Sequence, residues 1–271
     1  MKKSVFKLSP FLLLLFVFGC STSPHPEPEE VILRESNLPE WFASEVKLNE
    51  QAYYSMHPRP DLLFEKAVHS VVWLVSIDQK YHGAGVITPE GNILTNLHIA
   101  HHSNKWWVKF FNPEEHGGSK NPSVVNLSAS VEEIDNERDL ALLKVKSDSK
   151  NFSSVVLNGM ELGEVSNLKV GQQVFCIAHP KKQNFSFWEG RISRLIDDFE
   201  WEYYKNKSYK ANVIQIQMPQ NEGNSGAPIF DNMGRLIGIL TTVIRGGESL
   251  SYAVRIDEIE EFLIEVKQSN D

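Results

Sequence analysis

The sequence predicts an all-β fold that ends in a single C-terminal helix. Short runs of β-branched and aromatic residues alternate with turn-forming Gly, Pro, Asn and Asp along most of the chain, a spacing typical of a sandwich or of barrels. Residues 213–217 alternate strictly between apolar and polar side chains, as a half-buried strand does. Apolar residues then recur at helical spacing over 256–267, with glutamates between them, which predicts the closing helix.

The first segment, residues 1–19, is predicted to be a secretory signal peptide and not part of the fold. Lysines precede an apolar run over 11–18, and this run is too short to cross a bilayer, since about 20 apolar residues are needed. The stretch that ends in Gly19-Cys20 resembles the lipobox of bacterial lipoproteins, in which the cysteine is acylated and becomes the mature N-terminus. The alternative is an ordinary signal peptide that happens to contain a cysteine.

Lipidation of Cys20 would anchor the mature chain in the cell envelope, facing the periplasm, through its buried acyl chains. Ser21 favours the outer membrane, because Asp at this position tends to retain such proteins in the inner membrane. Residues 20–40, which contain a cluster of Pro and Glu, are expected to form a flexible tether. Residues 41–66 are expected to be a lead-in segment packed on the folded domain.

Charge and cysteine content exclude several classes of protein. Removing residues 1–19 takes away three lysines and no acidic residue, which changes the net charge from −8 to −11. Such an acidic chain is a poor candidate for binding nucleic acid, and strongly acidic substrates are disfavoured as well. If Cys20 is lipidated, Cys176 is left alone, so no intrachain disulfide is expected.

A serine flanked by glycines is the first candidate for chemistry. In Gly223-Asn224-Ser225-Gly226, the glycines permit a tight turn that other residues resist. Such a turn can present the hydroxyl group and bring two backbone N–H groups to one point, as acyl transfer requires. Asn, Gly and Ser are also common turn formers, so this segment alone fits a plain turn equally well.

A histidine and an aspartate elsewhere in the chain favour a catalytic serine over a plain turn. His98 follows the Gly-rich unit 83–95, and Asp139 stands directly before the apolar run 140–145. The chain order is His98, Asp139, Ser225, which matches chymotrypsin-like enzymes and not the Ser–Asp–His order of α/β-hydrolases. A lipase or esterase is disfavoured for this reason.

The segments around these three residues resemble the protease domain of the HtrA/Deg family, within the trypsin-like superfamily. The resemblance covers roughly residues 65 to 265. It implies two antiparallel six-stranded β-barrels, about 67–150 and about 155–254, within a trypsin-like domain over 67–268. It rests on three segments, which are 83–98, 138–145 and 221–228.

The same resemblance implies a serine endopeptidase that acts on envelope proteins through an acyl-enzyme and needs no cofactor. Ser225 would attack the substrate carbonyl, His98 would take the hydroxyl proton, and Asp139 would orient His98. The backbone N–H groups of Gly223 and Ser225 would form the oxyanion hole.

A specificity pocket is expected beside the nucleophile. Because no Asp occurs at 218–220, we expect the residue before the cleaved bond to be small or medium and apolar, and not Lys or Arg. The family resemblance implies that the pocket walls lie near Pro219, Gln220, Ile239, Leu240 and Thr241.

The sequence also departs from the family pattern. Ala227 replaces a second Gly after the serine, and His179 stands where the family usually has Asn. The chain ends soon after the predicted helix, so we expect no PDZ domain and carry over no regulation by one. An activating partner, if one exists, is not identified by the sequence.

Two further patterns have competing interpretations. His98, His101 and His102 lie close together, and in a helix His98 and His102 would share a face, as zinc ligands can. No Glu lies between them, so no metal site is expected. The aromatic and charged stretch 199–209 predicts a surface hairpin, with a loop that gates the site as the alternative.

For the whole chain, the alternative to a protease is a catalytically latent or inactive trypsin-like scaffold that binds other proteins.

Overall fold

A computed structural model describes most of the chain from residue 59 onward. All described residues fall within one compact unit, 49–271. The predicted signal peptide, Cys20, the tether, most of the lead-in segment and Gln220 lie outside them. The described ranges are 59–111, 125–146, 159–203, 207–219, 221–243 and 250–270.

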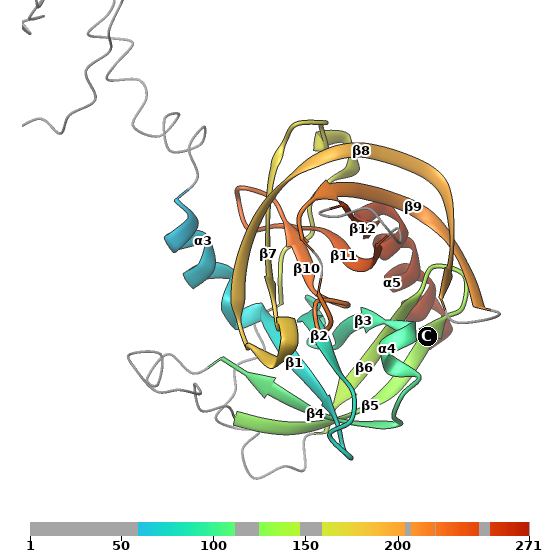
Figure 1. Ribbon diagram of the computed structural model, residues 1–271. Helices are drawn as coiled ribbons and strands as arrows, with labels where there is room; N and C mark the ends of the chain where they lie inside the picture. Colours follow the sequence, from blue (N-terminus) through green and yellow to red (C-terminus); the bar gives the residue numbers. More distant parts are fainter. Residues whose placement is uncertain are drawn as a thin grey trace, which may run out of the picture. The chain divides into compact units, whose positions relative to one another are not determined.

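Twelve strands form two closed antiparallel barrels (Figure 1). The N-terminal barrel has the order β1-β2-β3-β6-β5-β4, and the C-terminal barrel has the order β10-β11-β12-β9-β8-β7. The first contains β1 (Val71–Ser76), β2 (His82–Ile87), β3 (Ile93–Asn96), β4 (Lys105–Phe110), β5 (Val125–Asp135) and β6 (Leu140–Val145). The second contains β7 (Gln173–Ala178), β8 (Ser186–Tyr203), β9 (Lys207–Gln217), β10 (Pro228–Phe230), β11 (Leu236–Val243) and β12 (Leu250–Arg255).

Helices are short apart from the last one. Helix α5 follows the second barrel directly and buries Ile256, Ile259 and Phe262, the apolar face that its periodicity predicted. Among the described residues, no helix is both long enough and apolar enough to span a membrane. The helical elements are α3 (Pro60–Ala67), η2 (Val68–Ser70), α4 (Leu97–Ala100), η5 (Val165–Asn167), η6 (Pro180–Lys182) and α5 (Ile256–Asn270).

The predicted fold class, two six-stranded antiparallel barrels with a C-terminal helix, is confirmed. Strand β5 is one element that the sequence analysis did not find. Its small side chains alternate, with Leu127 and Ala129 buried and Ser128 and Ser130 half-buried. Serine has low strand propensity, so tertiary pairing with β4 and β6 forms this strand where its residues alone would not.

The two barrels are joined by hydrogen bonds at the face where the candidate residues lie. The N–H group of Ala84 on β2 donates to the carbonyl oxygen of Ser225, at 2.8 Å. His179, at the end of β7, contacts the carbonyl oxygen of Val72 on β1 through Nε2, at 3.1 Å. Residues from both barrels therefore form this face.

Candidate active site

His98 and Asp139 form a buried hydrogen-bonded pair. Nδ1 of His98 lies 2.7 Å from Oδ2 of Asp139, and the two side chains are 1% and 0% exposed. The backbone N–H of His98 donates to Oδ1 of the same carboxylate, at 2.9 Å. The carboxylate thus fixes both the ring and the backbone of His98, at the start of the short helix α4.

Local backbone geometry explains why Asp139 points at α4. Its φ angle of +59° lies in the left-handed region, which Asp tolerates better than most residues. Its carbonyl oxygen accepts from the N–H of Leu97 at 3.0 Å and from Nδ2 of Asn96 at 3.2 Å. Several hydrogen bonds, and not a single contact, therefore hold the end of strand β3 and His98 against Asp139.

Thr241, on β11 of the second barrel, completes the surroundings of the carboxylate. Its hydroxyl donates to Oδ2 of Asp139, at 2.6 Å in a buried position. The sequence analysis assigned Thr241 to the specificity pocket and missed this contact. No local signal marks it, because the two residues are 102 positions apart and belong to different barrels.

Ser225 lies on the loop between β9 and β10, and both neighbouring glycines adopt backbone angles that need them. Gly223 and Gly226 have φ angles of +95° and +83°. A Cβ atom on Gly223 would lie 2.3 Å from the carbonyl oxygen of His179, and one on Gly226 would lie 2.1 Å from that of Ala84. Only glycine fits at either position, as the tight-turn interpretation expected.

Two backbone N–H groups on this loop are available to a ligand. Among the residues that the structure describes, neither the N–H of Gly223 nor that of Ser225 donates a hydrogen bond to another residue. The loop is held by neighbouring groups, since the N–H of Gly226 donates to the carbonyl of Leu240 at 2.9 Å. The predicted oxyanion donors are thus unpaired on a fixed loop.

The serine and the histidine are not hydrogen-bonded to each other in this state. The Ser225 hydroxyl donates to the carbonyl oxygen of Thr241 in a long contact of 3.4 Å. Nε2 of His98 is buried and has no partner in the described part of the chain. The ring of Tyr203, from the end of β8, lies over the His98 ring, with centroids 4.2 Å apart and planes inclined by 32°.

Two more histidines surround the serine loop. Burial lowers the pKa of His82, whose ring lies where a Cβ on Gly223 would be, with Cε1 at 2.5 Å. His179 is fully buried: the Phe185 N–H donates to its Nδ1, at 3.0 Å. Burial lowers the His179 pKa to about 3, so its ring is neutral and packs as a structural group.

The residues expected to line the specificity pocket differ in their exposure to solvent. Ile239 and Leu240 have no exposed surface and belong to the hydrophobic core, whereas Pro219 is exposed. Side chains without exposed surface do not contact a substrate in this state. Their assignment as pocket walls remains a prediction.

No group of three or more His, Cys, Asp or Glu in the described ranges has an arrangement that could hold a metal ion. Cys176 is a buried free thiol, and burial raises its pKa. It lies within β7 and forms part of the core.

Comparison with known proteins agrees with this fold. A family model described as a trypsin-like peptidase domain matches residues 83–239. The match covers more than half of the chain, including the segments of His98, Asp139 and Ser225. The chain therefore belongs to the trypsin-like peptidase domain family.

Similarity to curated proteins indicates a group within this family. The chain is 29% identical over 181 residues to the serine protease Do-like HtrB of Bacillus subtilis, covering 65% of this chain and 36% of that protein. It is 30% identical over 186 residues to a probable periplasmic serine endoprotease, DegP-like, of Halomonas elongata, covering 67% of this chain and 34% of that protein. It is thus an HtrA/Deg-like member of the family, and the matched region spans about a third of the length of these two relatives.

Solved structures show the same fold at lower identity. The crystal structure of Deg5 matches with a TM-score of 0.58 and 24% identity, covering 74% of this chain and 91% of that chain. The active form of the Rv3671c protease from M. tuberculosis matches with a TM-score of 0.60 and 20% identity, covering 75% and 85%.

Proposed function

We propose that this protein is a serine endopeptidase in which Ser225 is the nucleophile, His98 the general base and Asp139 the residue that orients His98. The observation that carries the proposal is the buried pair of His98 and Asp139, 2.7 Å apart, beside a serine loop whose two N–H groups are unpaired. The match to the trypsin-like family supports it independently.

The proposal gives each group a role that its hydrogen bonds support. Asp139 accepts from Nδ1–H of His98, which leaves Nε2 as the nitrogen that takes the proton from the Ser225 hydroxyl and later gives it to the leaving amine. The Ser225 oxygen then forms an ester with the acyl part of the substrate, which water hydrolyses. The N–H groups of Gly223 and Ser225 would stabilise the negative charge on the carbonyl oxygen. In related sites one such donor contributes about 2.7–4 kcal/mol to the barrier reduction.

A catalytically latent state is the second candidate, and one observation favours it. The Ser225 hydroxyl contacts Thr241 and not His98, while Nε2 of His98 is buried without a partner. In this proposal the Ser225 hydroxyl has to leave the carbonyl of Thr241 and pair with Nε2 of His98 before the first step. We therefore propose a protease whose described state is at rest.

The names of relatives also support a proposal for the location of this protein. The DegP-like relatives are named as periplasmic, which supports a place in the cell envelope. We propose that Cys20 carries a lipid anchor there and that the substrates are envelope proteins, cut after a small or medium apolar residue at the pocket formed near Pro219, Gln220, Ile239, Leu240 and Thr241.

A fluorophosphonate probe tests the activity and the anchor together. We expect the wild-type protein to be labelled and Ser225→Ala to remain unlabelled, with Ser193→Ala, at a half-buried serine on β8, as the matched control that labels normally. In cell fractions the labelled protein should follow the membrane, and Cys20→Ala should move it to the soluble fraction. Labelling that survives Ser225→Ala would overturn the assignment of the nucleophile.

A further inference from the structure

The catalytic face of His98 is covered by an aromatic side chain from the other barrel. The ring of Tyr203 lies over the imidazole, with centroids 4.2 Å apart, and the His98 side chain is only 1% exposed. A general base has to exchange protons with the serine and with the leaving group. Nε2 of His98 is buried without a partner in the described structure, so in this state it exchanges protons with neither.

We propose that Tyr203 is an autoinhibitory latch, which closes the site by stacking on His98 and has to leave before Ser225 can react. This inference rests on the proposed function and deepens it, because it names the element that keeps the protease at rest. The latch consists of Tyr203 at the end of β8 and Lys207 at the start of β9. These two residues are paired in the strand register.

A second contact from the same hairpin supports the latch. Nζ of Lys207 donates to Nε2 of His101, which lies three residues after His98. Tyr203 and Lys207 therefore both reach the α4 region, one over the base and one beside it. Figure 1 shows the far end of the β8–β9 hairpin on the side of the molecule that carries α4.

The hairpin is anchored in its own barrel by a row of aromatic rings. Phe199 stacks on Tyr252 of β12 with centroids 4.7 Å apart and planes inclined by 4°. Trp201 follows two residues later. The centroid of its ring lies 6.0 Å from that of Phe199 and 5.7 Å from that of Tyr209. Because residues 199, 201 and 203 alternate along one strand, they share one face. The row that begins in the C-terminal barrel ends on His98.

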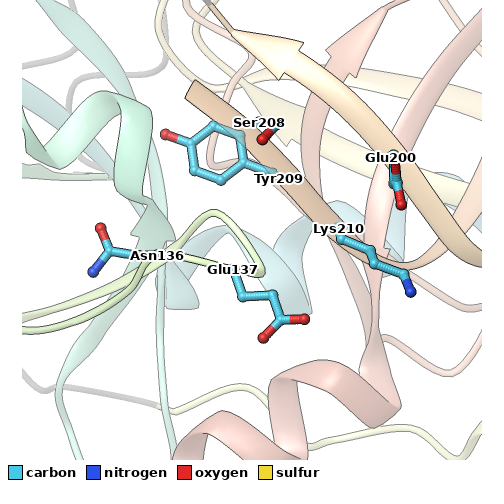
Figure 2. Close-up of a pocket in the computed structure, with 6 residues that line it drawn as sticks. All are labelled: Asn136, Glu137, Glu200, Ser208, Tyr209 and Lys210. Carbon is cyan, nitrogen blue, oxygen red and sulfur yellow. The ribbon is translucent and has the colours of Figure 1, made fainter. Parts of the chain in front are cut away.

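The hairpin meets the β5–β6 turn, next to Asp139, beside a pocket. The N–H group of Lys210 on β9 donates to the carbonyl oxygen of Glu137 in the β5–β6 turn, at 2.8 Å. Beside this hydrogen bond lies a pocket, and Figure 2 shows its lining side chains: Asn136, Glu137, Glu200, Ser208, Tyr209 and Lys210. Nε1 of Trp201 and the Tyr209 hydroxyl are buried without partners in the described structure. Unpaired buried polar groups cost free energy, and opening the hairpin would let water reach them.

The rate of fluorophosphonate labelling at Ser225 measures the open fraction. We expect Tyr203→Ala to label roughly two- to tenfold faster than the wild type, the change in population that the loss of one aromatic pair produces. Tyr203→Phe keeps the ring that stacks on His98 and should label more slowly than Tyr203→Ala. Tyr81→Ala is the matched control, because Tyr81 also stacks on a histidine, His102, at 3.8 Å, without covering His98.

A structural readout separates the latch from the activity. In a Ser225→Ala background, the Cε1–H resonance of His98 should be shifted upfield by the Tyr203 ring, and Tyr203→Ala should move it downfield while Tyr81→Ala leaves it unchanged. Equal labelling rates for wild type and Tyr203→Ala, or an unmoved resonance, would overturn the latch. A downfield move without labelling of any variant would support the latch and count against the proposed protease activity.

Discussion

At the scale of single residues, the sequence indicates the candidate catalytic residues but not the side chains that hold them in place. The residues His98, Asp139 and Ser225 were found from their order and flanking motifs, and the structure pairs the first two at 2.7 Å. The contributions of Thr241 and Tyr203 could not be found in this way, because each contact joins residues from different barrels. A pattern that is read along the chain contains no signal for a hydrogen bond between residues 102 positions apart.

Thr241 should act through Asp139 as a positioning residue. Thr241→Val keeps the shape of the side chain but removes the hydroxyl that donates to the buried carboxylate at 2.6 Å. Hydrogen bonds to charged groups contribute about 1.5–3 kcal/mol, so we expect the free energy of unfolding to fall by about that amount in urea denaturation. With a peptide substrate, kcat should fall while KM changes little. Thr241→Ser retains the hydroxyl and should restore both values; identical behaviour of the Val and Ser variants would rule out the role.

At the scale of elements, the β5–β6 turn is the point where the first barrel meets helix α5. Arg138, next to Asp139, is 15% exposed and contacts four carboxylates. One belongs to Asp135 in the same turn, at 2.7 Å. The others, on α5, are those of Glu258 at 2.8 Å, Glu261 at 2.8 Å and Glu265 at 3.1 Å. The predicted helix was confirmed, but its function as a tether for this turn depends on packing that periodicity does not encode.

Replacing Arg138 should loosen this tether. Arg138→Gln leaves the carboxylates of Asp135 and Glu258, which are 9% and 13% exposed, without their cation. We expect the free energy of unfolding to fall by about 2 kcal/mol, within the range for hydrogen bonds to charged groups. Lys210→Gln is the control, because its pair with Asp198 is 43% and 78% exposed and such exposed pairs contribute little to stability. Equal losses in urea denaturation of the two variants would contradict the tether.

At the scale of the whole molecule, the architecture was predictable while its resting state was not. Strand periodicity indicated barrels or a sandwich, and the family resemblance chose two barrels, which the topology confirms. Whether the barrels enclose an open or a closed site depends on a balance of weak contacts, such as the stacking of Tyr203 on His98. This balance depends on three-dimensional packing. The sequence motifs are identical in the open and the closed state, so they cannot tell one state from the other.

The contact between the barrels should make stability depend on pH through His179. The ring is fully buried and neutral, with a pKa lowered to about 3 by burial from an ordinary 6.5. Between these two values the unfolded chain binds a proton that the folded protein does not, so acid favours unfolding. One such proton lowers the free energy of unfolding by about 1.4 kcal/mol for each pH unit, whereas above pH 6.5 the effect disappears.

His179→Asn removes this proton and should flatten the acid side of the stability profile. We expect urea denaturation between about pH 6 and pH 4.5 to show a slope smaller than that of the wild type by about 1.4 kcal/mol per pH unit. Burial also lowers the pKa values of His101 and His102, which are common to both proteins and cancel in the difference. The pKa of His82 is lowered by burial as well, and His82 interacts electrostatically with His179, so it contributes to the difference. A lower stability of the variant at every pH, with a parallel slope, would mean that His179 is protonated in the folded protein and that the contact with Val72 is not held by a neutral ring.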